Sequence, residues 1–168
     1  MMEREQSGSP GVPTTYNLLF VCTGNTCRSP MAAAIARRAL ADRGWNHVAV
    51  ASAGLGAAYG APASENAVRV LAERGMDLSD HSSRPLTPEL VDWADLILAM
   101  SPAHLYGVAE LGGAAKSAML TDFMEGERLG EPVVDPFGAD EQVYRVTLRQ
   151  IEEAVEGILQ RLEPILAP

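Results

Sequence analysis

Short, wholly apolar runs alternate along this chain with stretches in which apolar residues recur at every third or fourth position. The apolar runs predict strands that are buried on both faces, and the periodic stretches predict amphipathic helices that cover them. Runs of strand-like length occupy residues 17–22, 48–52, 95–100 and 116–120. Their alternation with helices predicts an α/β fold with three αβα layers around a central four-stranded parallel sheet.

Capping residues mark where the expected helices begin and end. A serine or threonine followed by proline is typical of a helix start. Three such pairs are present, with Ser29, Thr87 and Ser101 as caps and Pro30, Pro88 and Pro102 as first helical residues. Another helix is expected from Ser64 to about Gly75. The final helix, expected at about 140–163, has the clearest apolar periodicity: Leu148, Ile151, Val155, Ile158 and Leu162.

The composition is that of one soluble globular domain, with 47% hydrophobic and 21% charged residues in a chain of 168. We expect this domain at residues 15–168 and a disordered extension at 1–14, a segment that is polar and rich in Gly, Ser and Pro. No apolar run is long enough to span a membrane, and the start lacks a signal-peptide core. The net charge of −9 argues against a nucleic-acid partner, because such partners are bound by basic patches. We therefore expect a cytoplasmic monomer without a membrane partner.

The candidate chemistry lies between the first strand and the first helix, in the sequence Cys22-Thr23-Gly24-Asn25-Thr26-Cys27-Arg28-Ser29. Such a loop turns several N–H groups toward one point and the helix N-terminus adds partial positive charge, so we expect a phosphate-binding loop. Gly24 and Asn25 are residue types that tolerate unusual backbone angles. The Arg28 guanidinium can grip two phosphoryl oxygens. These groups favour the thiolate of Cys22, and Ser29 can donate to its sulfur, which fits a phosphocysteine intermediate.

Other interpretations of this segment are weaker. An isolated cysteine at a strand end is more often a small buried hydrophobe, but the strand before it, the Gly-Asn pair and the Ser-Pro pair favour an anion site. The Gly-Lys-Ser/Thr ending of a nucleotide P-loop is absent. A zinc site is not expected, because Cys22 and Cys27 have no second pair and the histidines at 47, 81 and 104 are scattered.

The segment 21–32 resembles the signature of the low-molecular-weight protein tyrosine phosphatases, and the resemblance extends from about residue 17 to 162. Residues 51–54 resemble the family's second-strand ending, 77–85 its His-Ser-Ser segment and 134–138 its general-acid loop. The resemblance implies a metal-independent enzyme without cofactors that hydrolyses phosphorylated proteins through a phosphocysteine intermediate. A phosphate-binding module without turnover would require a lost nucleophile or acid, and the chain has lost neither.

The resemblance also assigns roles to individual residues. It implies that Cys22 is the nucleophile, that Arg28 binds the phosphoryl group and that Asp135 is the general acid. The residues implied to bind phosphate are Thr23, Gly24, Asn25, Thr26, Cys27, Arg28 and Ser29, and those implied to support the loop by hydrogen bonds are Asn25, Ser29, Ser52 and His81. Independently, Asp135 precedes Pro136 and so belongs to a stiff, extended surface loop. From the residues alone, capping a turn before the last helix is an equal alternative for Asp135.

Position 26 bears on the choice of substrate. Phosphotyrosine-directed members usually carry an aliphatic residue there, whereas the branch that resembles protein arginine phosphatases carries threonine, as Thr26 does here. Phe137 replaces the tyrosines that often follow the Asp-Pro pair, and the segment 55–60 lacks a tryptophan, with Tyr59 at an uncertain offset. We therefore expect phosphoarginine as the substrate group, with phosphotyrosine as the alternative.

Cys22 and Cys27 are the chain's two cysteines. Thiols this close suggest a reversible disulfide that protects the nucleophile from over-oxidation, and the resemblance implies the same. The equal alternative is that Cys27 only packs beneath the loop. The related arsenate reductases need further cysteines downstream, which this chain lacks, so arsenate reduction is not expected.

Overall fold

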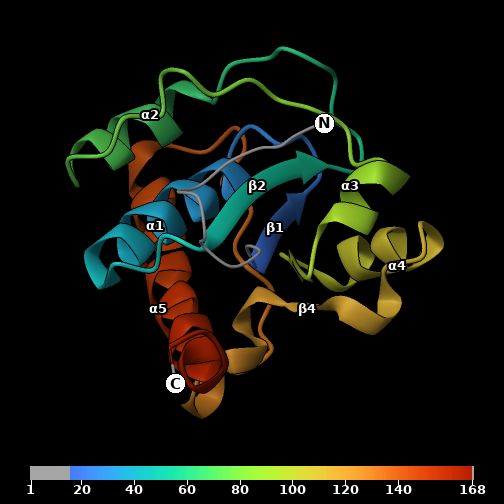
Figure 1. Cartoon of the computed structure of the whole chain (residues 1–168). Helices are drawn as coiled ribbons and strands as arrows, with labels where there is room; N and C mark the ends of the chain where they lie inside the picture. The colour runs from blue at the N-terminus through green and yellow to red at the C-terminus, as the bar shows by residue number, and fades with distance from the viewer. Residues whose placement is uncertain (1–15, 168) are drawn as a thin grey trace.

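The structure is a computed structural model that describes residues 16–167, so the disordered extension expected at 1–14 lies outside the described residues. Figure 1 shows the chain coloured by residue number. The strands are β1 (Tyr16–Cys22), β2 (Val48–Gly54), β3 (Leu96–Ala99) and β4 (Ser117–Met119). The helices are α1 (Arg28–Arg43), α2 (Glu65–Ala72), α3 (Pro88–Trp93), α4 (Pro102–Glu110) and α5 (Glu141–Leu166), with 3₁₀ turns at Ala114–Lys116, Leu120–Phe123 and Gly126–Arg128.

The strands form one parallel sheet in the order β2-β1-β3-β4, which confirms the expected α/β fold. Tyr16 pairs with Val48 on one side of β1, and Leu18 pairs with Leu96 on the other. The central place of β1 brings Cys22, its last residue, to the carboxyl edge of the sheet, where open α/β folds bind their ligands.

Helices cover both faces of the sheet (Figure 1). Leu18 and Phe20 of β1 pack in the larger apolar core, which includes buried residues of α1, α2 and α5. Leu19 and Val21 point the other way, into a smaller core that includes residues of α3 and α4. The alternation of side chains along β1 thus explains why its apolar run is unbroken: both faces are buried.

Three helix boundaries differ from expectation. Helix α1 begins at Arg28 with Cys27 as its cap, so Ser29 is a helical residue and not the cap. The Ser29 hydroxyl contacts Cys22 and Asn25 instead of a helix N–H, which removes it from capping. Helix α2 ends at Ala72, and the turn after it closes through Gly75, whose φ is +75°. Helix α5 continues to Leu166, beyond the expected end at 163.

The remaining starts agree with expectation. The Thr87 side chain accepts a hydrogen bond from the Leu90 N–H at 3.2 Å, as a helix cap does. Ser101 precedes α4 but makes no side-chain cap bond. Within residues 16–167, the structure contains no helix with the length and apolarity that a membrane crossing requires.

Candidate active site

In the loop between β1 and α1, the backbone carbonyls accept hydrogen bonds from the rest of the protein, whereas the backbone amides do not donate any within the part of the chain that the structure describes. The carbonyls of residues 22, 23, 25, 26 and 27 accept hydrogen bonds from Leu55, Gly56, His81, Ser64 and Met31. Among the described residues, the amides of residues 23–27 donate to no acceptor. A row of free N–H groups beside a helix N-terminus is the arrangement that binds tetrahedral oxyanions.

Asn25 sets the shape of this loop. Its φ is +56°, and it is the one non-glycine residue of the described chain with a positive φ. The fully buried side chain donates from Nδ2 to Ser29 Oγ at 2.8 Å and to Ser52 Oγ at 2.9 Å, and its Oδ1 accepts from the Arg84 N–H at 3.0 Å. These bonds hold a backbone conformation that costs about 1–3 kcal/mol in a non-glycine residue.

The two glycines at the loop have different roles. Gly24 does not occupy the left-handed region, and a Cβ on it would approach only Thr26 Oγ1, at an ordinary 3.6 Å. The unusual backbone angle expected for the Gly-Asn pair therefore belongs to Asn25 alone. Gly54 at the end of β2 is needed for close approach, since a Cβ there would lie 2.5 Å from the Thr23 carbonyl oxygen and 2.9 Å from the Asn25 nitrogen.

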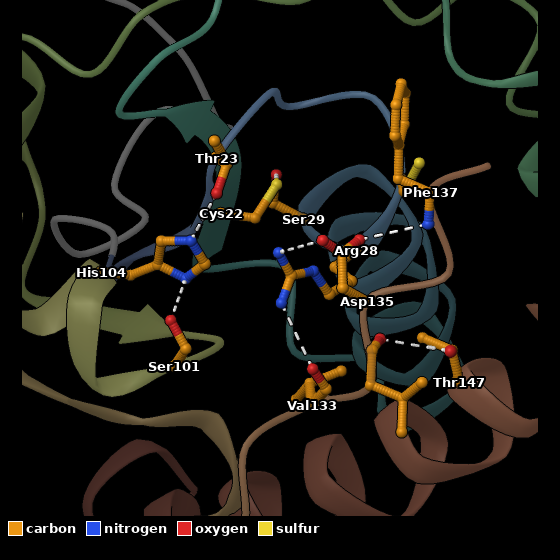
Figure 2. Close-up of polar contacts among 12 residues, drawn as sticks. Cys22, Thr23, Arg28, Ser29, Ser101, His104, Val133, Asp135, Phe137 and Thr147 are labelled. Atoms are coloured by element: carbon orange, nitrogen blue, oxygen red, sulfur yellow. Dashed lines mark hydrogen bonds and ion pairs between the residues drawn. The ribbon is translucent and has the colours of Figure 1, made fainter. Parts of the chain in front are cut away.

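Arg28 and Asp135 meet beside the loop. Arg28 is buried, and its Nη2 lies 3.5 Å from Asp135 Oδ2, whereas its Nη1 donates to the Val133 carbonyl at 3.2 Å (Figure 2). The Asp135 side chain is 57% exposed, and its Oδ1 accepts from the Phe137 N–H at 3.2 Å. Asp140 caps α5 by accepting from Val143, whereas the bond from the Phe137 N–H to Asp135 caps the turn before that helix, so Asp135 has the turn-capping role as well as the contact with Arg28.

The sulfur of Cys22 lies 2.9 Å from Ser29 Oγ, as Figure 2 shows. Asn25 donates to the same Ser29 oxygen, so the one proton of the serine hydroxyl has two acceptors within reach, the sulfur at 2.9 Å and, at a longer 3.5 Å, the Ala53 carbonyl. Both cysteines of the loop are free thiols and are buried.

His81 and Ser52 both form hydrogen bonds with Asn25 of the loop. His81 Nε2–H donates to the Asn25 carbonyl at 2.6 Å. Burial lowers the pKa of His81, and the positive charges of Arg37 and Arg84 lower it further, against the opposing effect of the bond to Asn25. The ring is thus kept neutral, with its proton on the nitrogen that faces the loop.

A cavity of about 220 Å³ lies above the loop. Its lining residues are Cys22, Thr23, Gly24, Thr26, Cys27, Arg28, Asp135 and Phe137. Phe137, which is 75% exposed, is the aromatic residue at its rim, and Tyr59 does not line it. A larger hollow of about 610 Å³ lies behind α1, where His81 and Ser52 line it, but Cys22 does not. Among the side chains that the structure describes, no three from His, Cys, Asp or Glu are grouped as a metal site would require.

The comparisons with known proteins agree with this geometry. The family model of the low molecular weight phosphotyrosine protein phosphatases matches residues 17–165. The chain belongs to this family. The protein-arginine-phosphatase of Geobacillus stearothermophilus is 39% identical to it over 150 residues, covering 88% of this chain and 97% of that protein. The probable low molecular weight protein-tyrosine-phosphatase EpsP of Ralstonia solanacearum is 37% identical over 148 residues, covering 88% and 97%.

A solved structure is similar as well. A mutant of the YwlE arginine phosphatase with a phosphorylated active-site serine superposes with a TM-score of 0.82 at 37% identity, over 89% of this chain and 97% of that one. The protein is therefore a protein phosphatase of the low-molecular-weight class.

No sequence pattern predicted the residues that hold the loop carrying Asp135 in this phosphatase. Gln150 and Thr147 are buried polar residues on α5. Gln150 accepts from the Val134 N–H at 3.0 Å and donates to the Pro132 carbonyl at 3.1 Å, and Thr147 donates to the Val134 carbonyl at 3.2 Å. The available signal was their place among the buried apolar positions of the last helix, since buried polar groups require partners.

The contacts of Tyr144 and His104 with the loop were not predicted from the sequence either. The Tyr144 hydroxyl lies 3.2 Å from Cys27 Sγ; burial, followed by the contact with Cys27, raises the pKa of Tyr144 to about 12. His104 Nε2 lies 2.8 Å from Thr23 Oγ1, on the opposite side of the loop. Both contacts join residues that are 81 or more positions apart, and no local pattern marks them.

Proposed function

We propose that this protein phosphatase hydrolyses phosphoarginine in proteins through a phosphocysteine intermediate, without a metal ion. The observation that carries the proposal is the polar character of the loop below the cavity: the free amides of residues 23–27 lie beside Cys22, and two hydroxyl-bearing residues, Thr23 and Thr26, line the cavity. A guanidinium group brings N–H donors into such a cavity, and hydroxyl oxygens can accept from them.

The first step uses three residues. The thiolate of Cys22 attacks phosphorus, the loop amides and Arg28 bind the phosphoryl oxygens, and the bond from phosphorus to the leaving nitrogen breaks. Protonated Asp135 gives its proton to that nitrogen, so that arginine leaves as a guanidinium and Asp135 becomes a carboxylate. The exposed position of Asp135, 3.5 Å from Arg28, is compatible with reaching a leaving group above the cavity.

The second step uses the same groups in reverse. Asp135, now a carboxylate, takes a proton from water, and the water oxygen attacks phosphorus as the bond to sulfur breaks. Ser29 donates to the departing sulfur across the 2.9 Å contact and stabilises it as a thiolate. Inorganic phosphate is the product, and Cys22 is regenerated.

Phosphotyrosine is the second candidate substrate group, favoured by two observations. The exposed ring of Phe137 at the rim can stack on an aromatic group, and EpsP, which carries a tyrosine-phosphatase name, is nearly as similar to this chain as the arginine phosphatase is. We favour phosphoarginine over phosphotyrosine because the Thr26 hydroxyl offers a phenyl ring less apolar contact than an aliphatic side chain would.

The test is kcat/KM of the reduced protein on matched phosphoarginine and phosphotyrosine peptides, with and without a chelator. A preference for phosphoarginine that survives chelation supports the proposal. Thr26→Ile should move the ratio of the two rates toward phosphotyrosine, and Thr26→Ser, which keeps the hydroxyl, should not. A wild-type preference for phosphotyrosine, or a ratio that Thr26→Ile leaves unchanged, contradicts the arginine assignment.

The reversible Cys22–Cys27 disulfide stays a prediction. The contacts of Cys27 with Tyr144 at 3.2 Å and with Ser64 at 3.4 Å support the alternative in which Cys27 packs beneath the loop. Mass analysis after mild peroxide treatment, with Cys27→Ser as the control, distinguishes the two. The single domain at 15–168, the monomeric state and the cytoplasmic location also stay predictions; limited proteolysis, light scattering and cell fractionation test them in turn.

A further inference from the structure

His104 is a buried histidine whose two ring nitrogens are both used. It lies in the first turn of α4 with 5% of its surface exposed. Nε2 lies 2.8 Å from Thr23 Oγ1, and Nδ1 lies 3.1 Å from Ser101 Oγ. Figure 2 shows the ring between these two hydroxyls, on the side of Cys22 opposite Asp135. The chain Ser101–His104–Thr23 therefore runs from the start of α4 to the wall of the cavity.

The ring is uncharged at neutral pH. The pKa of His104 is lowered to about 4, mainly by burial and then by the positive charge of Arg28, while the negative charge of Asp135 has the opposite effect. A neutral imidazole carries one N–H, so one nitrogen donates and the other accepts, whereas an imidazolium would donate from both. Thr23 thus faces a partner that fixes its side chain without bringing a second positive charge beside Arg28.

Thr23 retains hydrogen-bonding capacity for a ligand. Its hydroxyl has one proton and two acceptor lone pairs. If Thr23 donates to His104 Nε2, both lone pairs remain; if it accepts from Nε2–H, one lone pair and the proton remain. In either tautomer an acceptor position is left, and Thr23 is exposed and lines the cavity that contains Cys22.

A purely structural role accounts less well for this arrangement. A buried histidine needs partners, but Ser101 satisfies one nitrogen within the same turn, and the other reaches an exposed residue of the phosphate-binding loop. Since the residue that follows Cys22 is thereby tied to α4, the orientation of its hydroxyl is set by an element outside the loop.

We propose that His104 is a positioning residue of this phosphatase: it holds the Thr23 hydroxyl so that its oxygen accepts from the guanidinium of phosphoarginine. The proposal rests on the function proposed above. It adds a determinant of substrate choice that is independent of Thr26. A phenolic leaving group has no N–H to donate, so the Ser101–His104–Thr23 chain should matter more for phosphoarginine than for phosphotyrosine.

The experiment is a double-mutant cycle on kcat/KM with phosphoarginine and phosphotyrosine peptides. Thr23→Val removes the hydroxyl at nearly constant volume, and His104→Leu removes its partner. Each should lower kcat/KM for phosphoarginine about five- to tenfold, the worth of one hydrogen bond, and lower that for phosphotyrosine less. The double variant should lose no more than the worse single variant, because both changes break one contact.

Two conservative variants keep the test interpretable if His104→Leu folds poorly. Thr23→Ser keeps the hydroxyl and should retain the phosphoarginine rate, and His104→Gln places an amide near the position of Nε2 and should recover part of it. Independent, multiplicative losses in the cycle overturn the proposal, as do equal losses on both substrates. If the wild-type protein prefers phosphotyrosine, the proposed function itself fails; if it prefers phosphoarginine and the cycle is multiplicative, only the role of His104 fails.

Discussion

Replacing Gln150 with leucine should release the loop that carries Asp135. Gln150 is 2% exposed, accepts from the Val134 N–H at 3.0 Å and donates to the Pro132 carbonyl at 3.1 Å. Leucine has a similar volume and makes neither bond. The two peptide groups belong to a surface loop and can be partly rehydrated. We therefore expect the free energy of unfolding to fall by about 2 kcal/mol in total, near the low end of the cost of leaving two buried polar groups without partners.

The effect on catalysis should depend on the leaving group. Pro132 and Val134 lie on either side of Val133, whose carbonyl accepts from Arg28, and Asp135 follows directly. A loosened segment leaves the acid out of position for part of the time. An acidic phenol needs no proton in order to leave, whereas a poor leaving group does, so kcat should fall more for the poor one.

The assay measures kcat on two aryl phosphates, one whose leaving phenol is acidic and one whose leaving phenol is weakly acidic. Urea unfolding measures the change in the free energy of unfolding. Gln160→Leu is the matched control, because Gln160 lies on the same helix, is exposed and has, among the described residues, one side-chain hydrogen bond, to Glu156. It should change neither kcat nor the free energy of unfolding. Equal losses of kcat on both phosphates would refute the reasoning, since they would show that Gln150 supports the site without acting through Asp135.

Three further predictions test other parts of the site. Gly54→Ala should abolish most activity, because its Cβ would lie 2.5 Å from the Thr23 carbonyl oxygen, whereas Gly56→Ala, with 3.7 Å to the nearest atom of Thr23, should be tolerated; kcat/KM decides. The folded pKa of His104, about 4, lies below its ordinary value of 6.5, so the unfolded state takes up the proton first as pH falls. Stability should therefore drop between pH 6.5 and 4, by at most about 3 kcal/mol. His104→Gln should show a smaller drop in urea unfolding, and parallel curves would contradict this. Cys22→Ser should bind phosphate in calorimetry but lose turnover, and residual turnover near the wild-type rate would remove Cys22 as nucleophile.

The sequence predicted well what is encoded locally. The strand before Cys22, the loop and the helix after it are contiguous, so their residue types alone indicate where an anion would sit. The place of Ser29 was the exception. Its type and the proline after it are typical of a cap, but its hydroxyl is drawn into contacts with Cys22 and Asn25, and the helix begins at Arg28 instead.

Contacts between distant segments could not be predicted in this way. Three such residues lie far along the sequence from the loop: Gln150 and Tyr144 on α5, and His104 on α4. Each reaches the site only because the fold brings its helix close to the loop or to the segment before Asp135. Their sequence signal is a polar residue among buried positions, which says that a partner exists but does not identify it. His81 shows the same limit: its support of Asn25 was expected from the family resemblance, not from its surroundings in the sequence.

In this chain, whose net charge is −9, the proposed anion site contains very few positive groups. The free amides of residues 23–27 and the start of α1 provide partial charges, and Arg28 provides the full charge. Arg28 also contacts the loop that carries Asp135, through the Val133 carbonyl and the Asp135 carboxylate. A bound phosphoryl group competes with Asp135 for the same guanidinium, because both are anions. We therefore expect binding at Arg28 to free the carboxyl for the leaving group, which couples occupation of the site to the availability of its acid.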